Sequence, residues 1–441
     1  MRTSKWKLPC IWCVCLICAN FCMGFAASAH ELRVLHHFCS EQACADGAFP
    51  KDNLVRDSSG NLYGIAHMGG AYNHGAVFQA RKTEGGWKYK VIYDFCSVEL
   101  CADGADPDGG LIIDADGALY GTATAGGKDA PDGVAFKLTP DADGKNWNLR
   151  VLYDFCSQLN CVDGAAPAAA LAYQGKDSGA PYDGVSPLYG VALGGGANIR
   201  GVAFELKPRP NDQWRFKVLW NFCSKGGSFC LDGRSPQMPL LVDPKGNLFG
   251  VTPSGGFENV GVVFELRQKN DVWTETTIYS FCPSAGCVDG AVPSSALLRD
   301  SEGNLYGTTT AGGNPIQGGV LYKLSPRKSG WKQKNLHTFC SEPNCLDGNS
   351  PGWGLTGTDS GALLGMTISG GENDSDLGGD GTIYKIKKDA FKVIYNFCNR
   401  KDCADGGLPE ASVITEASGD LFGTAYTGGS NDRGTLFELK K

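Results

Sequence analysis

A small group of histidine and tyrosine side chains is the first place where this chain could do chemistry. His67, Tyr72 and His74 lie close together in and beside a glycine-bounded loop, Gly70 to Gly75. Two imidazoles and a phenol at this spacing could ligate a metal ion, move protons or hold a ligand. Ordinary loop residues are the simpler interpretation, so we treat the three as candidate ligand-binding residues and assign no catalytic residue.

One tryptophan breaks an otherwise regular pattern. Trp353 lies between Pro351 and Leu355, where we align other segments of the chain that carry Asn53, Gly110, Ala170, Pro239, Ala296 and Ser412. An aromatic side chain at such a place could stack on a sugar ring. Packing against its own Cys loop is the alternative, and it is favoured.

An acidic loop is a candidate calcium site. Asp374, Asp376 and Asp380 fall within the stretch 372–381 and offer the hard oxygen ligands that Ca²⁺ prefers. Their spacing differs from that of the twelve-residue calcium loop, so a solvated acidic loop is favoured over a Ca²⁺ site. We expect no other cofactor.

A phrase that recurs seven times positions all these residues. Each copy has Phe-Cys, a short loop to a second Cys, then Asp-Gly and Pro, and the copies start at Phe38, Phe95, Phe155, Phe222, Phe281, Phe339 and Phe397. This regular period predicts a closed repeat architecture. The Asp of each copy (Asp46, Asp103, Asp163, Asp232, Asp289, Asp347 and Asp405) is interpreted as a turn residue that accepts backbone N–H bonds. A ring of carboxylates that binds cations is the alternative.

The cysteines of the repeated phrase predict a disulfide framework. Nineteen cysteines are present, and fourteen of them lie in the seven copies. Thiolate metal sites need about four ligands each, and six histidines cannot complete seven such sites. We therefore expect neighbours to pair within each copy: Cys39–Cys44, Cys96–Cys101, Cys156–Cys161, Cys223–Cys230, Cys282–Cys287, Cys340–Cys345 and Cys398–Cys403.

The first 29 residues have the layout of a secretory signal. Three basic residues precede an apolar stretch that ends at Ala27-Ser28-Ala29. Cleavage predicts a secreted or periplasmic protein, and a retained anchor is the alternative. The net charge of −7 becomes −10 once those three positive charges are removed. No basic stripe is present, so we expect no nucleic-acid partner, no membrane partner after cleavage, and a monomer.

Each repeat reads as four short strands. In residues 107–155, apolar and β-branched runs alternate with Asp- and Gly-rich turns. The last copy supplies three strands, and residues 31–38 match a fourth. Residues 30–441 are therefore expected to form one all-β domain, a seven-bladed β-propeller closed by the N-terminal strand. The expected blades are 50–95, 107–155, 167–222, 236–281, 293–339, 351–397, and 409–441 with 31–38.

In this register the chain resembles the GloVer tandem-repeat family of secreted bacterial proteins. The resemblance rests on the phrases DxxGNLYGTTxxGG (Asp300 to Gly313) and GVVFEL (Gly261 to Leu266) and covers nearly all of residues 32–441. It implies export and propeller-like repeats, and it brings no established activity. Many relatives have a Gly-rich link where this chain has Cys loops, and many have a C-terminal anchor, which we do not expect here.

Three functions follow as hypotheses. The leading one is a binding module for carbohydrate or protein, which uses the face that carries the Cys loops, because unrepeated residues gather there. An enzyme that acts on polysaccharide, a hydrolase or a lyase, is the second, by fold analogy alone. A structural envelope or matrix protein is the third.

Overall fold

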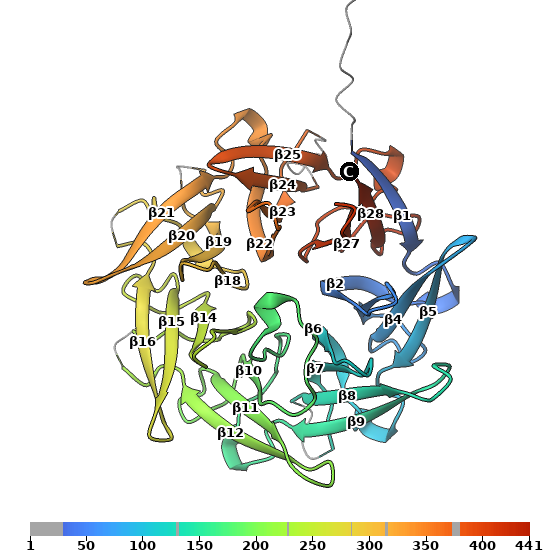
Figure 1. Cartoon of the computed structure of the whole chain (residues 1–441), viewed down its shortest axis with the longest axis horizontal. Helices are drawn as coiled ribbons and strands as arrows, with labels where there is room; N and C mark the ends of the chain where they lie inside the picture. Colours follow the sequence, from blue (N-terminus) through green and yellow to red (C-terminus); the bar gives the residue numbers. More distant parts are fainter. Residues whose placement is uncertain (1–29, 129–131, 227–228, 284, 314–315, 373–379) are drawn as a thin grey trace, which may run out of the picture.

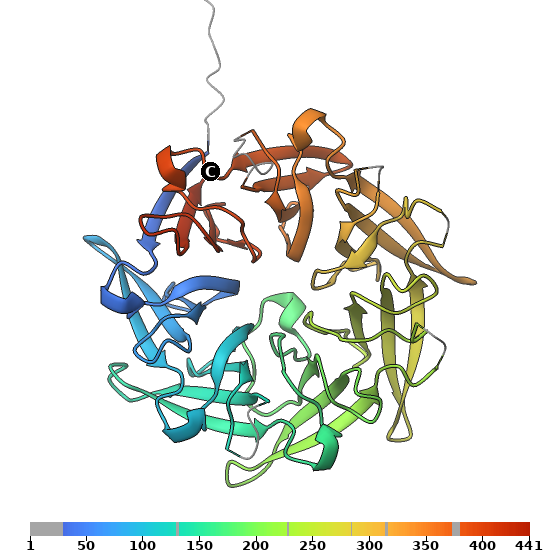
Figure 2. The same cartoon turned by 180° about the vertical axis from the view of Figure 1, so that it is seen from behind.

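Seven small antiparallel sheets form a closed ring in the computed structural model (Figures 1 and 2). The structure describes residues 30–128, 132–226, 229–283, 285–313, 316–372 and 380–441. The ring of seven sheets confirms the predicted β-propeller. The proposed signal, residues 1–29, lies outside the described residues. Among the described residues, no helix is long and apolar enough to span a membrane.

The first three blades follow the chain from the inside of the ring outward. Blade 1 contains β2 (Ala48–Arg56), β3 (Leu62–Met68), β4 (Ala76–Thr83) and β5 (Gly86–Asp94). Blade 2 contains β6 (Ala105–Ile113), β7 (Leu119–Ala125), β8 (Val134–Pro140) and β9 (Trp147–Asp154). Blade 3 contains β10 (Leu188–Ala192), β11 (Val202–Pro208) and β12 (Trp214–Asn221).

The other four blades have the same order. Blade 4 contains β13 (Leu241–Val242), β14 (Leu248–Thr252), β15 (Val262–Lys269) and β16 (Val272–Ser280). Blade 5 contains β17 (Ala291–Pro293), β18 (Leu298–Arg299), β19 (Leu305–Ala311), β20 (Val320–Arg327) and β21 (Gly330–Thr338). Blade 6 contains β22 (Asn349–Gly357), β23 (Leu363–Ser369), β24 (Thr382–Lys387) and β25 (Ala390–Asn396). Blade 7 contains β26 (Ile414–Thr415), β27 (Leu421–Ala425), β28 (Thr435–Lys440) and β1 (Glu31–His37).

Six short 3₁₀ turns are found among the described residues. Five lie in Cys loops: η1 (Gln42–Cys44), η2 (Glu99–Cys101), η3 (Leu159–Cys161), η5 (Pro343–Cys345) and η6 (Lys401–Cys403). The sixth, η4 (Lys176–Ser178), belongs to an insertion that precedes β10.

Blade 3 departs from the expected four strands. Its innermost segment, which we predicted as a first strand, forms two isolated bridges instead, Ala172–Tyr189 with β10 and Ala165–Gly194 just beyond it. The insertion that follows reaches toward the centre of the ring in both views (Figures 1 and 2). The Tyr182 N–H donates to the Ile113 carbonyl of blade 2 at 2.9 Å, and the Gln174 side chain donates to the Pro244 carbonyl of blade 4 at 2.9 Å. The insertion therefore links the two neighbouring blades across its own.

The ring closes where β1 pairs with β28. The two strands are antiparallel, from Glu31 opposite Lys440 to His37 opposite Thr435. Phe38, just after β1, has no exposed surface and packs edge to face on Phe78 of blade 1. Closure thus removes an exposed sheet edge and joins the ends of the chain through an apolar contact.

Aromatic residues fill the seams between blades. In five seams, the tryptophan that opens an outermost strand packs on an aromatic residue of the preceding blade: Trp87 on Phe422, Trp147 on Tyr63, Trp214 on Tyr120, Trp273 on Tyr189 and Trp331 on Phe249. The ring centres in these pairs lie 5.5–6.3 Å apart. These repeated tryptophans are therefore packing residues.

Strand order gives the ring two different faces. The Cys loops, which join one blade to the next, and the loops between the second and third strands lie on the Cys-loop face. The Asp-first turns between the first and second strands, such as Asp114 to Gly117, lie on the opposite face, here called the turn face. The third-to-fourth-strand hairpins also emerge on the turn face.

Candidate functional site

The Cys loops are rigid frames around the Cys-loop face. All seven predicted pairs form disulfides. In the first loop, Asp46 accepts hydrogen bonds from the Ser40 N–H at 2.9 Å, the Ser40 hydroxyl at 2.7 Å and the Glu41 N–H at 3.1 Å. The other six aspartates also accept at least one backbone N–H bond from their own loops. The turn interpretation of the repeated Asp is therefore confirmed.

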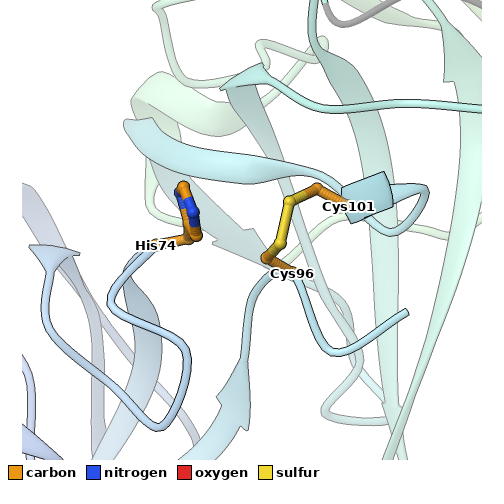
Figure 3. A group of neighbouring side chains, drawn as sticks. All are labelled: His74, Cys96 and Cys101. Carbon is orange, nitrogen blue, oxygen red and sulfur yellow. A yellow bond between two sulfur atoms is a disulfide. The ribbon is translucent and has the colours of Figure 1, made fainter. Parts of the chain in front are cut away.

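The structure separates the predicted histidine and tyrosine group. The His67 ring lies beside the channel, with Nδ1 3.1 Å from the Pro107 carbonyl and 3.9 Å from the Asp108 carboxylate. His74 instead lies beside the Cys96–Cys101 disulfide (Figure 3), and its Nδ1 is 3.3 Å from Asp106. Tyr72 is 53% exposed. The two histidines thus face different surroundings.

In two other blades, a carboxylate occupies the place that His74 has in blade 1. Asp132 lies within 4.8 Å of the sulfurs of Cys156 and Cys161, and Asp380 lies equally close to those of Cys398 and Cys403. These sulfurs are joined in disulfides, so they are not thiolate ligands. Burial, with Asp405 and Asp432 nearby, raises the pKa of Asp380. Asp374 and Asp376 of the predicted Ca²⁺ loop lie outside the described residues.

Trp353 reaches the channel through a β-bulge. The pairing of β22 with β23 shifts register between Pro351 and Leu355, and Trp353 has a positive φ of 66°. A bulge re-aims a side chain, and here the indole packs against a core cluster that includes Met238 and Leu297. Its Nε1 is buried and has no hydrogen-bond partner among the described residues. Our alignment was one residue out, because Gly354 lies beside Asn53 and Ser412.

Charged side chains from three blades meet beside this tryptophan. The Lys51 ammonium is 2.9 Å from Asp108 Oδ1 and 3.8 Å from Glu410 Oε2. It also lies 5.9 Å from the Trp353 ring centre and 5.7 Å from that of Tyr426. We call Lys51, His67, Asp108, Trp353, Glu410 and Tyr426 the channel-mouth cluster, because they come from blades 1, 2, 6 and 7 and meet beside the innermost strands, near the Cys loops.

Partial burial tunes the charges of this cluster. Lys51, Asp108 and Glu410 are 17%, 25% and 22% exposed. Burial raises the pKa of Glu410, and Asp108 raises it further, while Lys51 lowers it. Burial alone would lower the pKa of Lys51, but the charges of Asp108 and Glu410 hold it above its ordinary value. The cluster therefore places a lysine whose pKa is raised beside a glutamate whose pKa is also raised.

Deeper in the channel, a second lysine and aspartate interact. Asp52 accepts the Asn53 N–H at 2.6 Å and the Gly110 N–H at 2.7 Å. Burial raises the pKa of Asp52, while these hydrogen bonds and the charge of Lys176 oppose the rise. Lys176 comes from the blade 3 insertion, and burial lowers its pKa. The insertion thus places a charged side chain inside the channel.

The sequence analysis missed Lys51, Asp108 and Glu410. All three directly follow the repeated proline of their copy, whereas other copies have Ala168, Gln237, Ser294 and Gly352 there. A charged residue at a position that is otherwise small or polar was the available signal. Their convergence depends on three separate blades, which no local pattern shows.

A large cavity opens on the turn face. A cavity of about 1670 Å³ runs from Asn53 and Gly110 outward past Arg56 and Asp114. It continues beside Tyr306 and Lys323 of blade 5. We had expected the main ligand site on the Cys-loop face. The Cys-loop face carries the channel-mouth cluster, whereas this cavity opens on the turn face.

Fold and loops together define a disulfide-rich β-propeller of tandem repeats. A family model described as the Gloeobacter/Verrucomicrobia repeat matches residues 22–186 and 174–378. The chain therefore belongs to this family, which confirms the resemblance drawn from the sequence. Among curated proteins, no relative matches the sequence.

Solved structures resemble the chain in fold. An ancestral GH74 enzyme is similar at 12% identity and a TM-score of 0.54, over 90% of this chain and 48% of that one. A Trypanosoma rangeli sialidase in complex with the inhibitor DANA has 10% identity and a TM-score of 0.41, over 93% and 55% of the two chains. A Mycobacterium tuberculosis puromycin-hydrolyzing peptidase has 10% identity and a TM-score of 0.42, over 87% and 59%. The chain spans about half the length of these proteins, and such low identities show the fold alone.

Proposed function

We propose that this protein is an exported binding module that holds an uncharged carbohydrate at the channel-mouth cluster. The observation that carries the proposal is the meeting of two aromatic rings, Trp353 and Tyr426, around the Lys51 ammonium. Aromatic faces stack on apolar faces of sugar rings, and charged groups bind sugar hydroxyls through strong hydrogen bonds. Seven disulfides support a location in an oxidising compartment outside the cell.

The charge of the cluster supports a neutral ligand. Asp108 and Glu410 flank a single lysine, so an acidic sugar would meet two carboxyl groups that already share one cation. A protein ligand, the other class considered from the sequence, is left as an outcome of the test.

The test screens uncharged glycans with the exported full-length chain and follows each hit by calorimetry. Loss of one stacking ring costs about 0.5–1.5 kcal/mol, so Tyr426→Ala should weaken binding roughly threefold to tenfold. Lys51→Met and Trp353→Ala should also weaken it. Tyr72→Ala is the matched control, because Tyr72 lies outside the cluster and is exposed, and it should bind like the unmodified chain. If no glycan binds, or if only a protein ligand is captured, the proposal is wrong.

A polysaccharide-acting enzyme is a second candidate, favoured by one observation. Glu410 has a raised pKa beside a second carboxylate, Asp108, and such an asymmetric pair suits a proton donor and its partner. The same hits should be incubated with the protein and their reducing ends counted. New ends that Glu410→Gln abolishes would favour the enzyme, whereas binding without new ends would favour the module.

A further inference from the structure

Two of the seven seams between blades lack the tryptophan that closes the other five, and one of these two lies between blades 5 and 6. In blades 1 to 5, this tryptophan lies nine residues before the first Cys of the following loop, as Trp331 does before Cys340. The equivalent place before Cys398 in blade 6 holds Asp389. The residue that it should cover is Tyr306 of blade 5, at the position where blade 4 has Phe249 under Trp331.

A shortened hairpin explains the missing tryptophan. In blade 5, β20 and β21 continue pairing to Pro326 opposite Trp331 and to Arg327 opposite Gly330. In blade 6, pairing of β24 and β25 stops at Lys387 opposite Ala390. A tight turn of Lys388 and Asp389, both with positive φ, takes the place of the outer pairs. The blade 6 hairpin is therefore too short to cover Tyr306.

Blade 2 shows the closed version of the same arrangement. Tyr120 and Tyr306 each donate a hydrogen bond to the Asp of their own turn at 2.9 Å, Asp114 and Asp300 respectively. A lysine lies over each ring, Lys137 at 5.2 Å and Lys323 at 5.3 Å. Tyr120 is also covered by Trp214 and by Tyr182 of the blade 3 insertion, and it is 1% exposed. Tyr306 has no such cover, is partly exposed, and lines the cavity of the turn face.

Basic side chains surround this open seam. Lys323, Arg327, Lys332 and Lys388 all line the cavity beside Tyr306. Within the described part of the chain, none of these four makes an ion pair. Lys334 is paired with Asp389 across the seam at 3.2 Å. The seam is thus locally basic on a protein whose net charge is −7, and this local charge favours an anionic ligand.

We propose that the seam between blades 5 and 6 is a second binding site, for a glycan that carries carboxylate or sulfate groups. A sugar ring of the glycan stacks on Tyr306 in the space that tryptophan fills elsewhere, and its acidic groups pair with Lys323, Lys332 and Lys388. This site is independent of the channel-mouth cluster, because it lies on the other face and requires the opposite ligand charge.

The first test compares matched polymers by calorimetry with the full-length chain. Dextran sulfate and polygalacturonate should bind, uncharged dextran should not, and the two acidic polymers separate sulfate from carboxylate recognition. Tyr306→Ala and the double variant Lys323→Ala/Lys332→Ala should each weaken binding about tenfold. Lys137→Ala, the matched lysine of the closed seam, should change it less than about twofold. Lys51→Met should leave this binding unchanged, which separates the site from the channel-mouth cluster.

The second test closes the seam. Replacing Lys388-Asp389 with the blade 5 sequence Pro-Arg-Lys-Ser-Gly-Trp, residues 326–331, lengthens the hairpin and supplies the tryptophan. The graft adds positive charge, so the affinity for the acidic polymers would rise if the contact were merely electrostatic. If a sugar ring stacks on Tyr306, the grafted tryptophan blocks it, and the affinity should fall about tenfold or more. Unchanged or tighter binding in the folded graft would overturn the proposal. Failure of both acidic polymers to bind, or equal binding of single-stranded oligothymidylate through the same residues, would also overturn it.

Discussion

Replacing Lys51 with Met should weaken the fold in a way that depends on pH. The substitution keeps an unbranched apolar stem beside Trp353 and Tyr426 but removes the cation that separates Asp108 from Glu410. Opposite charges 3–4 Å apart attract by about 4–6 kcal/mol at an effective dielectric constant of 20. Returning the lysine to water offsets much of this attraction. Because the three groups remain 17–25% exposed, we expect a net loss of about 2 kcal/mol in the free energy of unfolding at pH 7.5.

The pH dependence follows from the raised pKa of Glu410. An acid whose pKa is higher in the folded state binds more protons there, so its contribution to stability falls as pH rises through the ordinary value toward the folded one. Lys51 lowers this pKa, and its removal therefore raises it further. The deficit of Lys51→Met should be small near pH 4, where Glu410 is protonated, and should grow toward neutral pH.

Urea denaturation at pH 4 and pH 7.5 measures both effects. The double variant Lys51→Met/Glu410→Gln provides the control, because it removes the unpaired carboxylate and should recover part of the loss at pH 7.5. An equal deficit at both pH values, or no recovery in the double variant, would refute the idea that Lys51 acts on these carboxyl groups by its charge.

Two further predictions concern the frame that positions both sites. Asp46→Asn should lower the unfolding free energy by about 1–3 kcal/mol at neutral pH, because buried donors lose a charged acceptor. Burial opposes the shift, but hydrogen bonds from Ser40 and Glu41 hold the pKa of Asp46 below its ordinary value. The stability that Asp46 contributes is therefore present at neutral pH and is lost as pH falls through the folded pKa. The difference between the denaturation midpoints of Asp46→Asn and the unmodified chain should be smaller at pH 3 than at pH 7, and an equal difference at both pH values would contradict this. Phe38→Ala and Phe155→Ala should each cost about 3–5 kcal/mol, because both rings are fully buried; a much smaller loss for Phe38→Ala in chemical denaturation would show that the closing strand is peripheral.

Repetition made the fold and its bracing predictable from the sequence. Each Cys pair is separated by five or seven residues, and each repeated Asp binds its own loop, so local chain geometry decides both. The closing strand was also predictable, because residues 31–38 match a strand that the last copy lacks. These features occur in every copy, and seven concordant copies outweigh the ambiguity of any single one.

The two proposed sites depend on contacts between blades, which sequence spacing does not report. Lys51, Glu410 and Trp353 belong to different blades, and closure of the ring brings them together. The bulge that directs Trp353 is a change of register that blade 1 also has, and the short hairpin that uncovers Tyr306 is a change in the pairing of β24 with β25. Such changes reposition side chains by their packing against neighbours. The sequence alone therefore determined a braced ring of seven blades, and the tertiary structure decided which side chains face one another across it.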